Sequence, residues 1–72
     1  MQKIEIDSPY ITLGQLLKKI DFVSSGGEVK MYLQTGVVKV NEEIELRRGR
    51  KIYPQDQVAI EGYGHVQVFY SK

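Results

Sequence analysis

The chain has 72 residues, a formal net charge of +1 and no cysteine. This length predicts a single domain over residues 1–72 with a small core, because a domain of about 60 residues buries only about 60% of the surface of its unfolded chain. The absence of cysteine excludes a disulfide framework and thiolate metal sites, so we expect a cytoplasmic protein with no metal or other cofactor. No apolar stretch approaches the roughly 18 residues of a membrane span, and no membrane partner is expected.

The charges are unevenly distributed along the chain. Between residues 30 and 53 there are six basic and three acidic residues, whereas the remainder carries four basic and six acidic residues. The net charge of the whole chain therefore says little about its partners, but the local positive excess in the middle of the chain favours an anionic one.

The first part of the chain predicts a strand followed by a short helix. Residues 3–7 alternate apolar and charged side chains, as in a half-buried strand, and Pro9 limits its continuation. Thr12 and Gln15 have the spacing of a helix-capping box. The apolar residues that follow recur at helical spacing, at Leu13, Leu16, Leu17 and Ile20.

A second helix is predicted after a linker at residues 21–24. Ser25 is the expected N-cap, with Glu28 at the reciprocal position of a capping box, and Gly36 is placed to end the helix as a C′ glycine. Because the linker is so short, the two helices must pack against each other as a compact hairpin, with the apolar pair at the centre of the linker filling the corner.

From residue 37 onward the pattern changes to short alternating strands, the first at residues 37–40, and Asn41-Glu42 has the position of a tight turn. In residues 43–46 apolar side chains alternate with Glu43 and Glu45, which predicts a strand whose glutamates form a solvated face. The order of strand, two helices and several short strands predicts an α+β fold. In this fold a two-helix hairpin packs on one side of a small, mostly antiparallel sheet.

Catalysis is poorly supported by the residue types present. The only histidine, His65, has no cysteine or serine motif to serve as its nucleophile, and we interpret it as an ordinary surface or half-buried residue. The three glutamates between residues 42 and 45 fall short of the about six oxygen ligands that a dedicated calcium site needs. The protein is therefore predicted not to be an enzyme.

Two consecutive glycines, Gly26 and Gly27, follow the expected N-cap of the second helix. Each costs about 1 kcal/mol relative to alanine within a helix, so some other role should compensate. One interpretation is functional: helix amides that no side chain shields can approach a phosphate, and Lys30 adds a cation nearby. The other interpretation is a tight corner in which larger side chains would clash.

A basic run occupies residues 47–51, with Arg47, Arg48, Arg50 and Lys51 around Gly49, which we expect to let the backbone turn. Such a density of charge between two strands of a small domain is typical of a nucleic-acid-binding surface, and arginine suits bidentate contact with phosphate. As exposed charges, these arginines are expected to change stability by no more than about ±0.5 kcal/mol each.

Two further elements stand out beside the helical residues above, Gly36-Val37-Val38-Lys39-Val40-Asn41 and Pro54-x-Asp56-x-Val58. Through these residues the chain resembles, from Leu13 to Gly62, the S4 RNA-binding domain, also called the αL motif, and within it the small stand-alone bacterial YaaA-type branch. The chain departs from the family where many members carry two arginines, at Gly26 and Gly27. It also departs at two turn glycines, which are Glu42 and Gln55 here.

The resemblance implies a non-catalytic module that binds structured RNA, ribosomal or transfer RNA, through the second helix and the adjoining strand loops. The expected contacts are Gly26, Gly27, Lys30, Lys39, Asn41, Arg47, Arg48, Arg50 and Lys51. We expect a monomer that binds free RNA or ribonucleoprotein, without an exposed aromatic platform, since Tyr32 and Tyr53 are interpreted as core and edge residues.

Two alternatives belong to other functional classes. The first is a protein-interaction domain that docks an acidic partner in a ribosomal or replication assembly, because a basic patch alone does not distinguish acidic protein from RNA. The second is a sulfur carrier of ubiquitin-like fold. It is disfavoured because such carriers use a C-terminal Gly-Gly, whereas this sequence ends in Tyr70-Ser71-Lys72.

Overall fold

The computed structural model describes residues 1–71 of the chain. Nine elements are present in this range, two helices and seven strands. They are β1 (Gln2–Ile6), β2 (Ile11–Thr12), α1 (Leu13–Lys19), α2 (Gly26–Gln34), β3 (Val38–Val40), β4 (Glu43–Ile44), β5 (Lys51–Ile52), β6 (Gln57–Ile60) and β7 (Gly64–Tyr70). The longest helix has nine residues, and no helix within residues 1–71 has the length and apolar character to cross a bilayer.

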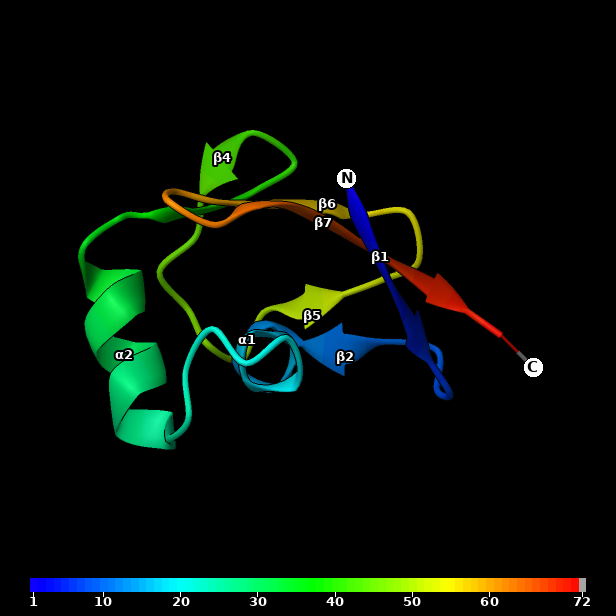
Figure 1. The fold of residues 1–72 in the computed structure, drawn as a ribbon, viewed down its shortest axis with the longest axis horizontal. Coiled ribbons are helices and arrows are strands. Elements are labelled where there is room, and N and C mark those ends of the chain that lie inside the picture. The colour runs from blue at the N-terminus through cyan, green and yellow to red at the C-terminus, as the bar shows by residue number, and fades with distance from the viewer. Residues whose placement is uncertain (72) are drawn as a thin grey trace.

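The strands form a five-stranded sheet in the order β1-β7-β6-β3-β4 and a two-stranded sheet of β2 and β5. Among the strand pairs of residues 1–71, β1–β7 is parallel and the others are antiparallel. Both helices lie on one side of the larger sheet, with α1 next to the β2–β5 pair (Figure 1). The expected α+β fold, a helical hairpin on a mostly antiparallel sheet, is confirmed.

Local signals in the sequence define both helix starts. Thr12 and Gln15 form the complete capping box: each side chain accepts a hydrogen bond from the other's backbone amide. At α2 the Ser25 hydroxyl accepts from the Glu28 amide, as expected, but the Glu28 carboxylate binds the backbone and hydroxyl of Ser24 instead of closing the box on Ser25. These hydrogen bonds from Ser24 are the main cause that lowers the pKa of Glu28.

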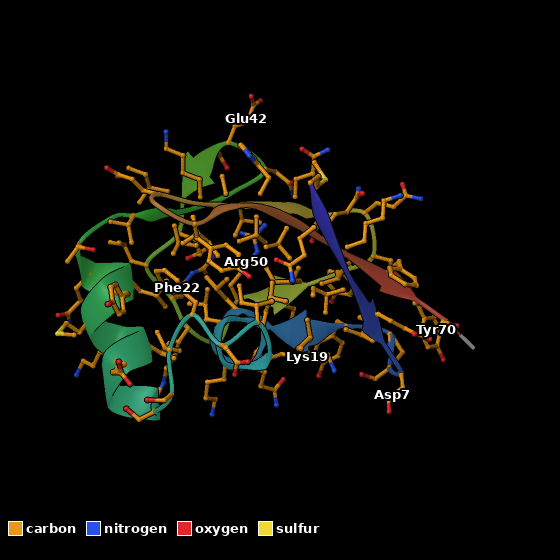
Figure 2. The ribbon with its side chains drawn as sticks, viewed as in Figure 1. Asp7, Lys19, Phe22, Glu42, Arg50 and Tyr70 are labelled. Atoms are coloured by element: carbon orange, nitrogen blue, oxygen red, sulfur yellow. The ribbon has the colours of Figure 1, made fainter. Side chains whose placement is uncertain are left out.

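The corner between the helices is filled as the short linker predicts. Val23 is buried in the core, and the ring of Phe22 packs against Tyr32 and Tyr63 with centroids 4.8 Å and 5.8 Å away. The Phe22 side chain lies beside the α1–α2 connection in Figure 2. Gly36 has a φ of 75° after the last turn of α2 and so acts as the expected C′ glycine.

One hydrophobic cluster of isoleucine, leucine and valine residues joins the helices to the larger sheet. The sheet contributes Val38, Val40, Val58, Ile60, Val66 and Val68 from its inner face. Because side chains alternate along a strand, the residues between these point away from the helices. Lys39, Ala59 and His65, which are cross-strand neighbours, therefore lie on the outer face of the sheet, opposite to both helices (Figure 1).

In residues 43–46 the expected solvated face of glutamates is correct for Glu43, which is exposed, but wrong for Glu45. Glu45 is buried, with 6% of its surface exposed, whereas Ile44 and Leu46 are 58% and 56% exposed. The alternation is inverted because Ile44 pairs with Lys39 and shares its outward direction. The amide of Glu45 donates to the carbonyl of Val38 (3.0 Å), which aligns Glu45 with a buried residue of β3.

The two turns in which the family has glycine keep a glycine-like backbone here. Glu42 has a φ of 74° and Gln55 a φ of 76°, both in the left-handed region. Asn41 joins the two turns, because its side-chain amide donates to Asp56 (3.1 Å) and its side-chain oxygen accepts from the Gln57 amide (2.9 Å). Figure 2 shows Glu42 projecting outward beside β4.

Candidate nucleic-acid interface

The basic run at residues 47–51 is held against the start of α1. The Leu13 amide donates to the Arg50 carbonyl (2.8 Å), and the Gly14 amide donates to the Arg48 carbonyl (2.9 Å). A Cβ atom at Gly14 would lie only 3.4 Å from that Arg48 oxygen, so Gly14 permits the close approach of the two backbones. The start of a helix leaves backbone amides without partners inside the helix. Here the carbonyls of the basic run accept from two of these amides, and the hydrogen bonds fix the position of the run.

The loop turns without needing a glycine. The Arg50 amide donates to the Arg47 carbonyl (3.3 Å), which closes a turn around Arg48 and Gly49. Gly49 does not have a positive φ, and a Cβ atom there would meet nothing within 4 Å. The expected turn at Gly49 is present, but its backbone does not depend on glycine, since another residue could adopt the same conformation.

Two of the three arginines in the run bind the buried carboxylate of Glu45. Arg47 donates from its amide and Nε (both 3.0 Å) and from Nη2 (3.2 Å), and Arg50 donates from Nη1 (2.7 Å). These hydrogen bonds, those of the Arg47 side chain foremost, lower the pKa of Glu45 to about 2. Arg50 is accordingly drawn between the larger sheet and β5 in Figure 2, and its side chain is only 33% exposed.

This pairing argues against the expectation that all of these arginines are exposed charges with little effect on stability, since Arg50 is only 33% exposed and both Arg47 and Arg50 bind Glu45. A buried carboxylate requires partners, and losing one leaves a desolvated charge in place. Arg47 and Arg50 therefore have a structural role, whatever else they contact. We call Glu45, Arg47 and Arg50 the Glu45 cluster.

Arg48 points elsewhere, toward the start of α2. Among the described residues it forms no salt bridge, and its Nη1 lies 3.8 Å from the place that a Cβ atom at Gly26 would occupy. A hollow of about 220 Å³ opens here between the two helices and the loop. We call it the basic groove; it is lined by Thr12, Gly14, Gln15, Lys18, Gly26, Val29, Arg48 and Gly49.

A second hollow continues along α2 from the basic groove. Lys30, Gln34 and Leu46 line it, and Arg48 belongs to both hollows. The cations Lys18, Lys30 and Arg48 thus line the two adjoining hollows beside α2. Lys18 was not among the expected contacts, although it follows Gly14 by four residues and so shares its helical face.

The paired glycines at the start of α2 are not explained by crowding. Gly26 and Gly27 both have helical backbone conformations. A Cβ atom would have its nearest neighbour 3.8 Å away at Gly26 and 4.0 Å away at Gly27, which is ordinary contact. The tight-corner interpretation therefore loses its basis. The first backbone hydrogen bond of the helix joins the Val29 amide to the Ser25 carbonyl, and within residues 1–71 the amides of the two glycines have no partner.

The remaining expected contacts lie away from the basic groove. Lys39 is on the outer face of the larger sheet, and the side chain of Asn41 is engaged with Asp56. Lys51 is exposed on β5, with its Nζ 5.0 Å from the ring centroid of Tyr10. The structure thus brings Gly26, Lys30 and Arg48 together and separates them from Lys39 and Asn41.

Comparison with known proteins agrees with this architecture. The sequence profile of the S4 domain matches residues 4–69, which include β1 and β7 as well as the stretch 13–62. The chain is also 52% identical over 65 residues to a Bacillus subtilis (strain 168) protein described as "Probable ribosome maturation protein RlbA". The alignment covers 90% of this chain and 92% of that protein, so both have a similar length. The resemblance to a small stand-alone S4-domain protein is confirmed, and the chain belongs to the S4 domain family.

Proposed function

We propose that the protein is a non-catalytic RNA-binding domain, residues 1–72, that binds structured ribosomal RNA during ribosome maturation in the cytoplasm. Membership of the S4 domain family and similarity to a protein named for ribosome maturation support this proposal. The observation that carries it is the basic groove, where Arg48 has no acidic partner among the described residues and lies against the open start of α2.

The basic groove, together with the adjoining hollow and the start of α2, offers three kinds of contact to an RNA backbone. Arg48 supplies a planar guanidinium that can donate two parallel hydrogen bonds to one phosphate. Lys18 and Lys30 supply mobile cations on either side of it. The amides of Gly26 and Gly27 supply hydrogen-bond donors at the positive end of the helix dipole. These groups recognise phosphate geometry and not base edges, so we expect recognition of RNA shape with little sequence preference.

Binding of an RNA hairpin to the full chain, measured by fluorescence anisotropy, tests the groove. Arg48→Glu should weaken binding at least about tenfold, because it places a negative charge among the phosphates. Lys3→Glu on the outer sheet face makes the same change in net charge and should have less than about a twofold effect. Equal losses in the two variants would show that overall charge, and not the groove, attracts the RNA.

A protein partner is distinguished by a separate measurement. If an acidic protein occupied the groove, partners captured from a cell lysate would stay bound after ribonuclease treatment, and Arg48→Glu would release them. Under our proposal ribonuclease removes the captured material. Lys39→Glu shows whether bound RNA also reaches the outer sheet face, since that lysine lies far from Arg48 in the fold.

A further inference from the structure

Two exposed tyrosines form a pair beside the basic run. The rings of Tyr10 and Tyr53 have centroids 5.7 Å apart and planes inclined at 48°, and the residues are 38% and 48% exposed. The Nζ of Lys51 lies 5.0 Å from the Tyr10 centroid, a distance suited to a cation–π contact. We call these three residues the tyrosine patch.

The tyrosine patch is held by backbone and side-chain hydrogen bonds. Tyr53 begins a turn in which its amide donates to the Asp56 carboxylate (2.9 Å) and its carbonyl accepts from the Asp56 amide (3.0 Å). The carbonyl of Tyr10 accepts from the Ser8 hydroxyl (3.0 Å), and β2 follows directly. Both rings are therefore placed on ordered backbone, which lowers the entropy cost of binding a flat ligand.

The tyrosine patch adjoins the basic groove through the β2–β5 pair. Thr12 is the register partner of Lys51, and Thr12 also lines the groove beside Gly14. A nucleic-acid backbone that leaves the groove along β2 would therefore reach Lys51 and then the two rings. The expectation that Tyr53 is only an edge residue is thus incomplete, because the fold pairs it with a second exposed aromatic ring.

We propose that the tyrosine patch stacks an unpaired nucleobase next to the structured RNA held in the basic groove, with Lys51 contacting the phosphate of that nucleotide. This inference rests on the proposed function and narrows the RNA to one with a single-stranded segment beside a duplex. Aromatic faces stack on any base, and a neighbouring lysine neutralises the backbone charge. The two rings suit the flat apolar face of a nucleobase, and the lysine suits the negative charge of its phosphate.

The test compares two RNAs that share one hairpin, one blunt and one with an extension of about three unpaired nucleotides. Wild-type protein should bind the extended RNA at least about fivefold more tightly than the blunt RNA. Tyr53→Leu should abolish this preference and leave the affinity for the blunt hairpin unchanged. Tyr53→Phe should retain the preference, because the stacking face remains. Phe69→Leu removes an exposed ring from the outer sheet face and should change nothing.

A direct readout places 2-aminopurine in the extension, where stacking on a ring quenches its fluorescence. We expect quenching with the wild type and with Tyr53→Phe but not with Tyr53→Leu. A wild type without a preference for the extended RNA, or a Tyr53→Leu variant that keeps it, would overturn the proposal. Arg48→Glu should weaken binding of both RNAs. If it weakens neither, the proposed function fails, which is distinct from failure of the tyrosine patch.

Discussion

Arg48 and the Glu45 cluster occupy the same short segment, yet they differ in what their charges do. Arg47 and Arg50 donate four hydrogen bonds to the Glu45 carboxylate, whereas Arg48 has no acidic partner among the described residues and lies over the start of α2. Neighbouring residues with the same charge can therefore hold a loop in one case and face a ligand in the other. The density of charge in a sequence predicts a basic surface but not which cations are available to it.

The largest expected effect is a loss of stability, which distinguishes the structural role of the Glu45 cluster from the ligand-facing role of Arg48. Glu45→Gln should lower the free energy of unfolding by about 2–4 kcal/mol, because the two arginines lose the charge that they surround. Urea denaturation followed by circular dichroism measures this change. Glu43→Gln, at an exposed neighbour, should stay within about 0.5 kcal/mol. A Glu45→Gln protein as stable as the Glu43→Gln control would mean that the Glu45 cluster contributes nothing to the fold.

The same carboxylate predicts how stability depends on pH. The pKa of Glu45 is lowered from 4.5 to about 2 in the folded protein by its hydrogen bonds to Arg47 and Arg50. The contribution of the ionised Glu45 carboxylate to the free energy of unfolding is therefore fully present above pH 4.5, and it is lost as the pH falls from 4.5 toward about 2. Denaturation curves over this range should show a steeper loss for the wild type than for Glu45→Gln. Parallel losses in the two proteins would assign the acid sensitivity to other groups.

A smaller and opposite effect is expected at the start of α2. Gly27→Ala should stabilise the protein by up to about 1 kcal/mol, because the backbone is helical and the added methyl group would make only an ordinary contact, 4.0 Å from the Ser25 hydroxyl oxygen. The same methyl group would stand near the helix amides and should weaken RNA binding. Thermal unfolding and anisotropy on the same sample check both changes. Higher stability with unchanged binding would remove these amides from the interface.

The smallest effect concerns the turn at the tip of β3 and β4. Glu42 has a φ of 74°, a conformation that disfavours side chains, so Glu42→Gly should stabilise the fold by about 0.5–1 kcal/mol. RNA binding should be unchanged, because this turn is remote from the basic groove. Chemical denaturation gives the stability, and a destabilised variant would show that the Glu42 side chain makes a contribution that outweighs its backbone strain.

The parts of the fold that depend on local chemistry could be predicted from the sequence. The capping box of Thr12 and Gln15 and the terminal glycine at Gly36 are each set by residues a few positions apart, and the structure has them as expected. The departures Glu42 and Gln55 likewise mark turns whose backbone still has the conformation of the family glycines. Interactions of this range need no knowledge of the tertiary structure.

The parts of the fold and of the site that depend on packing between distant residues could not be predicted from the sequence. An alternating pattern does not say which of its two faces turns toward the core, and here the register with β3 aligns Ile44 with outward-facing Lys39, so Glu45 is buried while Leu46 is exposed. Lys18 becomes part of the basic groove only because α1, α2 and the loop meet there. Neither this register nor the meeting of three segments leaves a signal in residue spacing.

The salt dependence of RNA binding tests the central claim most directly. For each phosphate contact, the slope of log K against log salt changes by about 0.7–0.9 between about 50 and 300 mM salt. Arg48→Gln should reduce the magnitude of the slope by about this amount, whereas Lys3→Gln should leave the wild-type slope of about −3 to −5 unchanged. An unchanged slope in the Arg48→Gln protein, or a salt-independent wild type, would contradict the assignment of the basic groove as the RNA-binding site.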